Sequence, residues 1–297
     1  MLRVPSSDGV SVAVHELAGD GTTERQVLLI AHASGFHAHA YLPLATRLAP
    51  PFHVFGMDFR GHGDTPRPDD WQVDWGRYGD DALAVADAVA ELGDGLVGFG
   101  HSMGGAGLLM AASRRPDRFR LLVLFEPIVY PPDSDRPEGP NQLVAGARRR
   151  RASFPSIDAA IANYAAKPPL DAFDPAALDA YVRYGFAPTI DGDDRDGSAV
   201  RLKCEPEHEA RTFEQGALHR TWELLGDIEV PTVVIAGRIE EHQPSRIAEA
   251  VADELPNGRF VLAPQLDHFG PFVDPADIAQ LVLAAVDDAH VPADPPG

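Results

Sequence analysis

The sequence contains a single cysteine and no long apolar segment. Cys204 alone cannot form an internal disulfide framework or a cysteine-based zinc cluster, and it fits a reducing compartment. No apolar run approaches the roughly 20 residues that a helix needs to span a bilayer, and the first residues lack the charged-then-apolar pattern of a secretory signal. We therefore expect a soluble, cytoplasmic protein.

Basic residues are also scarce relative to acidic ones. The 297 residues include 25 Lys and Arg against 45 Asp and Glu, which gives a formal net charge of −20. The field of such a chain repels phosphate backbones and anionic lipid headgroups, so we expect neither nucleic acid nor a membrane as a partner. The one basic run, four arginines at 148–151, is expected to form a solvated helix face.

The first 130 residues have the pattern of an α/β fold. Short apolar runs alternate there with stretches of helical period, which is typical of a parallel sheet covered by helices. Apolar positions at helical spacing mark the intervening helices. The expected strands are 10–14, 27–31, 53–57, 96–99 and 121–125, and the expected helices are 78–92 and 103–113.

The segment that follows Tyr130 interrupts this alternation. Residues 131–140 are rich in proline, which cannot continue a helix or a central strand. Only helical patterns follow, from about 141 to 227, and an acidic, glycine-bearing loop at 191–197 breaks them. This segment is therefore expected to be an inserted helical cap.

The alternation returns after the cap. We expect a core domain made of residues 1–130 and 228–297, with residues 131–227 inserted between its two parts. The expected elements of the second part are strands 232–236 and 260–263 and helices 245–255 and 274–289.

The strongest chemical signal is a GxSxG pattern at 100–104, directly after an expected strand and directly before a helical stretch. A serine in that setting lies in a tight turn that lifts its hydroxyl above the sheet, so Ser102 is a candidate nucleophile. The same geometry points the Met103 backbone N–H at an oxygen on the carbon that Ser102 attacks. The alternative is a serine that only caps the helix.

A serine hydroxyl needs a base, and the base needs an orienting partner. Of the twelve histidines, only His268 lies in a loop just after the final expected strand, where the sites of parallel sheets open. Its position after the serine in the chain agrees with the order that this kind of sheet uses. We expect His62 and His101, which lie inside other motifs, to hold loops by hydrogen bonds.

Five segments together resemble the α/β-hydrolase superfamily in order and approximate spacing, over about residues 10 to 290. The resemblance implies an α/β-hydrolase fold, a mostly parallel twisted sheet flanked by helices with a cap over the pocket. It also implies a Ser/acid/His triad that needs no cofactor, and an oxyanion hole built partly after the third strand. The segments that carry the resemblance are 32–36, 58–63, 100–104, 237–240 and 267–269.

Two glutamates compete for the role of triad acid. Family members usually carry Asp three residues after the glycine that ends the seventh strand, where this sequence has Glu240. A subset takes a glutamate from the end of the sixth strand instead, and Glu126 follows the apolar run 121–125 in that way. Burial of a carboxylate is costly unless it is paired, so we favour Glu126, and Glu240 could be a solvated loop acid.

The oxyanion donor is also open between two residues. The family motif runs His-Gly followed by the donor. Aligning Gly35 with the motif glycine makes Phe36 the donor through its backbone N–H, whereas aligning His32 makes Ser34 the donor. We favour Phe36, because Gly35 supplies the backbone freedom that the turn needs.

Histidines and aromatic residues supply the candidate substrate contacts. His32, His37 and His39 could suggest a metal, but no carboxylate or cysteine completes the set at close spacing, so we expect no metal and partly exposed loop histidines. The cap has more aromatic residues than thin helices need for their own contacts, and some should face the pocket. The candidate substrate contacts are His37, Tyr164, Tyr181 and Trp222.

These features predict a cofactor-independent serine hydrolase that cleaves a carboxylic ester, thioester or lactone of moderate size and apolar character through an acyl-enzyme. The alternatives are a carbon–carbon bond hydrolase of diketone-type substrates and a non-hydrolytic ligand-binding member of the fold. Epoxide and haloalkane hydrolysis are disfavoured, because they rely on an aspartate nucleophile and position 102 is serine. A monomer and a homodimer are both compatible with the sequence.

Overall fold

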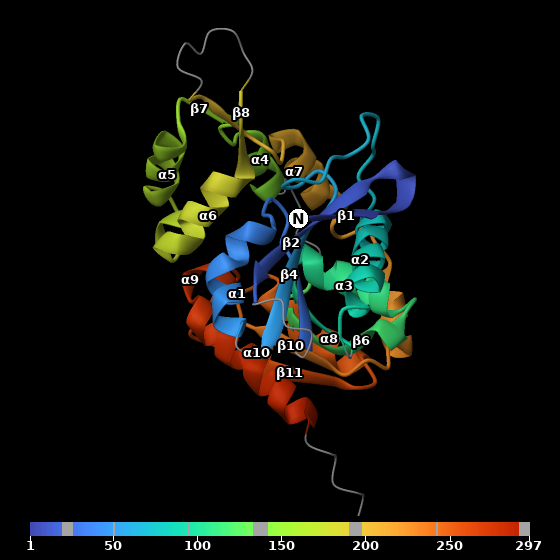
Figure 1. Ribbon diagram of the computed structural model, residues 1–297. Helices are drawn as coiled ribbons and strands as arrows, with labels where there is room; N and C mark the ends of the chain where they lie inside the picture. The colour runs from blue at the N-terminus through green and yellow to red at the C-terminus, as the bar shows by residue number, and fades with distance from the viewer. Residues whose placement is uncertain are drawn as a thin grey trace, which may run out of the picture.

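The computed structural model describes residues 1–19, 26–49, 51–93, 95–132, 142–189, 198–241 and 243–290. An eight-stranded sheet in the order β1-β2-β4-β3-β5-β6-β10-β11 forms its centre (Figure 1). The antiparallel pairs β1–β2 and β2–β4 lie at one edge, and every other pair is parallel. The strands are β1 (Leu2–Pro5), β2 (Ser11–Ala18), β3 (Gln26–Ala31), β4 (Phe52–Asp58), β5 (Leu96–His101), β6 (Phe119–Phe125), β10 (Thr232–Ala236) and β11 (Gly258–Leu262).

Helices cover both faces of the sheet. α2 (Trp75–Ala90), α3 (Met103–Ala112) and α8 (Ser245–Glu254) pack on one face, and α1 (Leu42–Leu48) and α10 (Pro275–His290) pack on the other. Along β3, Leu29 belongs to the first apolar cluster and its neighbours Leu28 and Ile30 to the second, because successive side chains of a strand point to opposite faces. Strands buried on both faces need continuous apolar runs, which is why the pattern of these segments was informative.

The expected core elements are confirmed within a few residues at each end. β1 was not predicted, and α2 begins at Trp75, three residues earlier than expected, where the Asp74 carboxylate accepts a hydrogen bond from the Gly76 N–H at 2.8 Å. None of the helices in the described part of the chain is both long and apolar enough to cross a bilayer.

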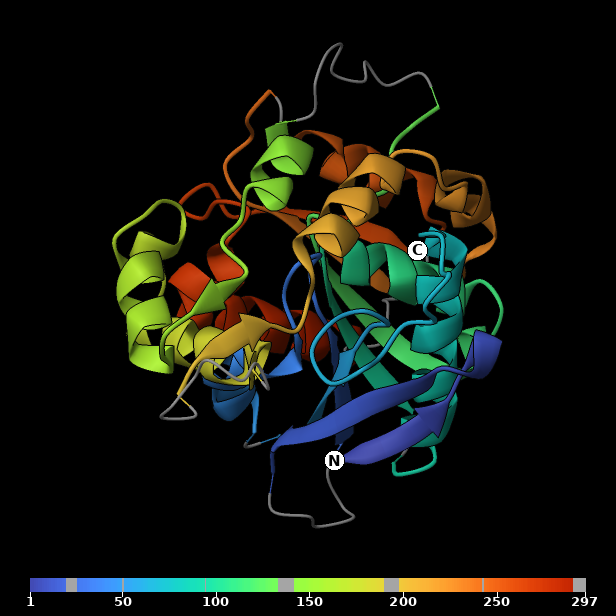
Figure 2. The same ribbon diagram turned by 90° about the horizontal axis from the view of Figure 1, so that it is seen from above.

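The elements from α4 to α7, which we call the cap, lie together at one end of the sheet (Figures 1 and 2). Their three short strands form a separate antiparallel sheet in the order β7-β9-β8. They include α4 (Gln142–Arg148), β7 (Ser153–Phe154), α5 (Ile157–Ala165), α6 (Pro175–Gly185), β8 (Phe186–Pro188), β9 (Val200–Leu202) and α7 (Pro206–Gln215). The 3₁₀ segment η5 (Thr221–Asp227), which follows, packs against α3 and α8 instead.

The prediction of a purely helical cap was therefore wrong. Strands of two or three residues are too short to show the alternation that marks a strand in a sequence, and β9 joins β7 and β8 only through tertiary pairing. The proline-rich residues 133–140 and the acidic loop 191–197 lie outside the described residues.

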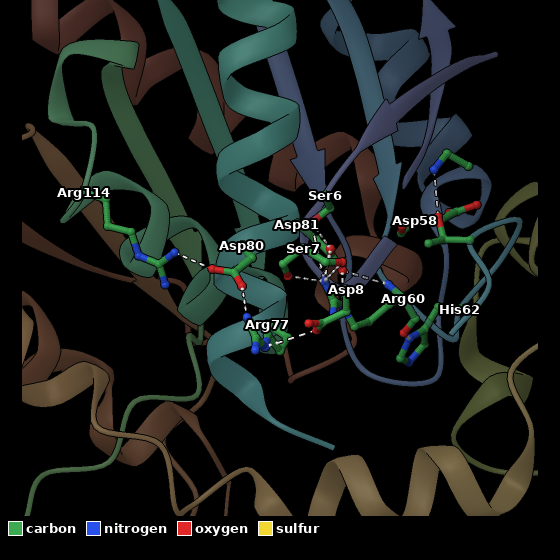
Figure 3. Close-up of polar contacts among 12 residues, drawn as sticks. Ser6, Ser7, Asp8, Asp58, Arg60, His62, Arg77, Asp80, Asp81 and Arg114 are labelled. Carbon is green, nitrogen blue, oxygen red and sulfur yellow. Dashed lines mark hydrogen bonds and ion pairs between the residues drawn. The ribbon is translucent and has the colours of Figure 1, made fainter. Parts of the chain in front are cut away.

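A buried ion pair fixes the loop that follows β4 (Figure 3). The Arg60 side chain is fully buried, and its Nε and Nη2 donate to the two carboxylate oxygens of Asp81 on α2 at 2.9 and 2.7 Å. Its Nη1 donates to Asp8, between β1 and β2, at 3.0 Å. Asp58, at the end of β4, accepts from the backbone N–H groups of Ala38 and Asp64, both at 2.8 Å. The 58–63 motif is thus a structural support beneath the loop that follows β3.

Candidate active site

Ser102 occupies the sharp turn between β5 and α3. Its φ of 56° and ψ of −115° lie in a region that residues other than glycine rarely adopt. The turn can close because its glycines let the chain pass at short range: a Cβ on Gly104 would lie 2.0 Å from the Ala31 carbonyl oxygen. The Ser102 hydroxyl makes no capping hydrogen bond to α3, so it does not serve as a helix cap. This is the geometry that a nucleophilic serine requires.

Met103 begins the helix behind this serine. The backbone N–H groups of Gly105 and Ala106 bond to the Ser102 carbonyl oxygen at 3.1 and 3.4 Å, whereas the Met103 N–H makes no hydrogen bond within the described residues. It is therefore available to an oxygen held at the positive end of α3.

His268 and Glu126 form the charged part of the site. The Nδ1 of His268 donates to the Oε2 of Glu126 at 2.6 Å, and the backbone N–H of Gly237, at the end of β10, donates to Oε1 at 2.8 Å. The Glu126 side chain is only 1 % exposed, and burial is tolerable because both oxygens accept a hydrogen bond. With its proton on Nδ1, His268 keeps the Nε2 lone pair as a proton acceptor.

Glu240 lies outside this arrangement. Its side chain is 45 % exposed and accepts a hydrogen bond from the Nε of Arg238 at 2.9 Å. The structure therefore brings Glu126, and not Glu240, to His268.

Main-chain contacts hold the serine turn beside these two residues. The backbone N–H of Ser102 donates to the carbonyl oxygen of Phe125, the residue before Glu126, at 3.0 Å. The preceding residue, His101, contacts the carbonyl oxygen of His268 at 2.9 Å. The three candidate triad residues thus lie on adjacent loops at the carboxyl ends of the strands.

The hydrogen bonds of the loop after β3 do not support Phe36, the oxyanion donor that we favoured from the sequence. The Phe36 N–H donates to the Ala33 carbonyl oxygen at 3.1 Å and closes a tight turn in which Gly35 has a φ of 78°. The glycine does supply the expected freedom, but the turn that it permits occupies the Phe36 N–H. The Ser34 N–H makes no hydrogen bond to another described residue, so the geometry favours Ser34.

A buried relay connects this turn, 33–36, to the loop of His268. The Ala33 N–H donates to the hydroxyl oxygen of Tyr41 at 3.1 Å, Tyr41 bonds to the Nδ1 of His101 at 2.8 Å, and the Nε2 of His101 bonds to the carbonyl of His268 at 2.9 Å. A carbonyl can only accept, so Nε2 carries the proton and Nδ1 accepts from the Tyr41 hydroxyl. Burial lowers the pKa of His101 well below its usual value, which keeps this pattern intact.

The expectation that His101 and His62 hold loops is confirmed. His62 contacts the carbonyl oxygen of Arg60 through Nδ1 at 3.2 Å. Tyr41, in contrast, was missed, because only its contacts with segments distant in the sequence reveal its role.

Two of the three histidines of the loop after β3, His32 and His37, are not partly exposed as predicted, whereas His39 is. His32 is fully buried; its Nδ1 donates to the Ala33 carbonyl, its Nε2 accepts from the Phe59 N–H, and burial lowers its pKa to about 3. His37 is also buried; its Nε2 donates to the carbonyl oxygen of Tyr181 in the cap at 2.9 Å, and burial lowers its pKa to about 4. Both are core histidines with backbone partners.

A group of possible metal ligands does occur beside these histidines, formed by His15, Asp58 and Asp64. The donor set does not suit a cation. The Oδ2 of Asp58 already accepts from His15 Nε2 at 2.9 Å, in addition to its backbone donors, and Lys203 Nζ lies 2.6 Å from Asp64 Oδ1. We assign the group to the ion pairs and hydrogen bonds that join the cap, through Lys203, to the core.

Aromatic side chains surround Phe36, next to the serine turn. Its ring centroid lies 4.4 Å from that of Phe272 and 5.0 Å from that of Tyr181, and Phe173 and Phe269 complete the cluster. Of the predicted substrate contacts, Tyr181 belongs to this cluster. The ring of Tyr164 packs against that of Tyr181, with 5.8 Å between the ring centroids.

Trp222 does not join them. It lies in η5 and packs against the apolar cluster on the sheet face that α2, α3 and α8 cover. Its predicted contact with substrate finds no support in this position.

The arginine run is not uniformly solvated, contrary to expectation. Arg148 ends α4 and pairs with Glu207 on the surface. Arg150 instead packs inward, with its guanidinium 5.7 Å from the ring centroids of both Tyr164 and Tyr181. A run of like charges in a sequence does not show which member has a buried partner.

Comparison with known proteins identifies the family, since a model described as "Alpha/beta hydrolase family" matches residues 27–281. The chain belongs to the alpha/beta hydrolase family. The fold and the family that the sequence motifs implied are thereby confirmed.

Relatives of this alpha/beta hydrolase include the pimeloyl-[acyl-carrier protein] methyl ester esterase of Neisseria meningitidis serogroup B / serotype 15 (strain H44/76), 27 % identical over 259 residues, which cover 85 % of this chain and 89 % of the relative. The monoglyceride lipase of Homo sapiens is 33 % identical over 110 residues, 36 % of each chain. Among solved structures, E-2-(acetamidomethylene)succinate hydrolase superposes with a TM-score of 0.72 and 21 % identity, covering 96 % of this chain and 98 % of that one.

Proposed function

We propose that this alpha/beta hydrolase is a serine hydrolase that cleaves a carboxylic ester, thioester or lactone through an acyl-enzyme. The observation that carries the proposal is the 2.6 Å contact between His268 Nδ1 and Glu126 Oε2, which orients the imidazole and leaves its Nε2 free to accept a proton beside the Ser102 turn. The names of two relatives, a methyl ester esterase and a monoglyceride lipase, agree with ester chemistry.

In the first half of the reaction, Ser102 Oγ attacks the carbonyl carbon while His268 Nε2 takes its proton. The carbonyl oxygen becomes an oxyanion, which the N–H groups of Met103 and Ser34 bind. Collapse of this intermediate breaks the bond to the leaving oxygen or sulfur, which takes the proton from His268. The acyl group remains on Ser102.

In the second half, water gives a proton to His268 Nε2 and attacks the acyl carbon. The second oxyanion occupies the same donors, and its collapse returns the proton to Ser102 Oγ and releases the acid. Glu126 stabilises the imidazolium in both halves and stays ionised throughout. The aromatic cluster around Phe36 supports an apolar acyl or leaving group of moderate size.

The test uses 4-nitrophenyl acetate and butyrate with the wild-type protein and with Ser102→Ala. Hydrolysis by the wild type that Ser102→Ala lacks supports the proposal. If the two proteins hydrolyse both esters at the same rate, the serine mechanism is wrong. A fluorophosphonate probe adds a second criterion, because a ligand-binding member with an inactive triad reacts slowly with it and turns over no ester.

A further inference from the structure

Arg150 is a cation in aromatic surroundings. Its side chain is 15 % exposed and its guanidinium lies over two tyrosine rings. Its Nη1 donates to the Oε2 of Glu209 on α7 at 2.5 Å, and its Nε lies 3.4 Å from the Tyr164 hydroxyl. A buried ion pair is weak evidence for a contribution to stability, because apolar residues of similar volume commonly replace such a pair without loss. Its presence therefore asks for a functional reason.

The pair lies directly over the turn that we assign to the oxyanion. A Cβ built on Gly35 would lie 2.2 Å from Glu209 Oε1, so the Glu209 carboxylate rests against the backbone of the turn. On the other side of Arg150, the ring of Tyr181 lies 5.0 Å from that of Phe36. Glu209 and Tyr181 thus lie between Arg150 and the turn at residues 33–36.

One nitrogen of the guanidinium, Nη2, has no partner in the described part of the chain. Nη1 contacts Glu209 and Nε contacts Tyr164, whereas Nη2 has no hydrogen-bond partner among the described residues. Nη2 is also not fully buried. Glu209 and the tyrosine rings hold the planar group in one orientation. A fixed guanidinium with one free NH₂ group is suited to a carboxylate, which accepts hydrogen bonds in the plane of the guanidinium.

The net charge of the chain is unfavourable for an anionic substrate. A protein with a net charge of −20 repels small anions. An anionic substrate then needs a local cation, and Arg150 is one whose tyrosine neighbours keep most of its side chain out of solvent, where charges interact more strongly than in water.

We propose that Arg150 forms a subsite for a carboxylate that the ester substrate carries away from the scissile bond. This inference rests on the proposed function, and it replaces a purely apolar substrate by an apolar one with an anionic end. The carboxylate belongs to the acyl chain or to the leaving group, and both sources share the same chemistry. Glu209 acts as a positioning residue that orients the guanidinium.

The experiment compares ester pairs. On the acyl side, mono-4-nitrophenyl glutarate is compared with the neutral 4-nitrophenyl pentanoate. On the leaving-group side, 4-carboxyphenyl butyrate is compared with phenyl butyrate. Each ester is measured with the wild type, with Arg150→Met, and with the matched control Arg151→Met, in which the neighbouring exposed arginine, stacked on Phe154 at 4.4 Å, is changed.

We expect Arg150→Met to lower kcat/KM at least about tenfold for one of the two carboxylate esters, mainly through KM, because it loses a hydrogen bond to a charged group. The neutral partner of that ester should change less than about twofold, and Arg151→Met should leave both unchanged. Which carboxylate ester responds assigns the charge to the acyl chain or to the leaving group. An equal loss for charged and neutral esters, or no loss for any, would overturn the inference.

A measurement on the wild type covers the case in which Arg150→Met does not fold. Glutarate and its neutral diamide, glutaramide, are compared as competitive inhibitors of 4-nitrophenyl butyrate hydrolysis. The inference expects glutarate to bind at least about tenfold more tightly, and equal inhibition would contradict it. If no ester is hydrolysed faster than by Ser102→Ala, the proposed function itself has failed, which is a different result.

Discussion

Replacing Glu126 by glutamine tests the contact between Glu126 and His268 with almost no change in side-chain volume. In the structure the Oε1 accepts from the Gly237 N–H and the Oε2 accepts from His268 Nδ1. Glutamine can keep only one of these contacts, because one oxygen becomes an NH₂ group. If its oxygen stays with Gly237, the NH₂ group faces Nδ1 and forces the imidazole proton onto Nε2. His268 then cannot accept the proton of Ser102.

We expect kcat to fall by about 10²- to 10⁴-fold, the cost of the wrong tautomer together with the lost stabilisation of the imidazolium. Glu240→Gln is the matched control, because that side chain is exposed and contacts Arg238, and it should stay within about twofold of wild type. Steady-state hydrolysis of 4-nitrophenyl butyrate measures both variants. A larger loss in Glu240→Gln than in Glu126→Gln would refute the assignment of the acid.

Three further predictions concern the relay, the core and pH. Tyr41→Phe leaves the Ala33 N–H and His101 Nδ1 without their partner, so kcat should fall about tenfold with little change in KM, and an unchanged kcat would remove the relay from the account. Arg60→Met leaves the buried Asp81 carboxylate without its bidentate partner and should lower the free energy of unfolding in urea by about 3 to 5 kcal/mol, whereas a loss below about 1 kcal/mol would contradict this role. Burial lowers the pKa of His37 to about 4, so below pH 6.5 the unfolded chain binds more protons than the folded one. The free energy of unfolding should therefore decrease as pH falls from 6.5 to about 4, by up to about 1.4 kcal/mol per pH unit for each such histidine. A free energy of unfolding that stays constant or rises over this range in urea titrations would contradict the prediction.

The parts of the fold that could be predicted are those written in short stretches of sequence. The strand, turn and helix around Ser102 are consecutive in the chain, and the central strands need apolar runs because both of their faces are covered. The cap strands β7, β8 and β9 could not be found, since each has only two or three residues and β7 pairs with β9 across the intervening α5, α6 and β8.

The site was predictable to the extent that each residue type has few alternatives. Ser102 and His268 each had one position that fitted the order of a triad, and the structure places them on adjacent loops. The choice between Glu126 and Glu240 depends on how the end of β6 meets the end of β10, where Gly237 donates to Glu126. Such a contact between segments more than a hundred residues apart is not written in either motif.

The turn at residues 33–36 shows why a motif alone can mislead. Gly35 fits the residue before the donor in a family alignment, yet the same glycine allows a turn whose closing bond uses the N–H of Phe36. Only the hydrogen-bond partners of successive N–H groups separate Ser34 from Phe36. Burial likewise could not be deduced for His32 or Arg150, because their partners lie in other parts of the chain.

Covalent labelling tests the central claim most directly. After reaction with a fluorophosphonate, peptide mass spectrometry should find one adduct, on Ser102, and the labelling rate should fall at least about 10²-fold in His268→Ala, which lacks the base. An adduct on another residue, or equal labelling rates in His268→Ala and the wild type, would contradict the triad.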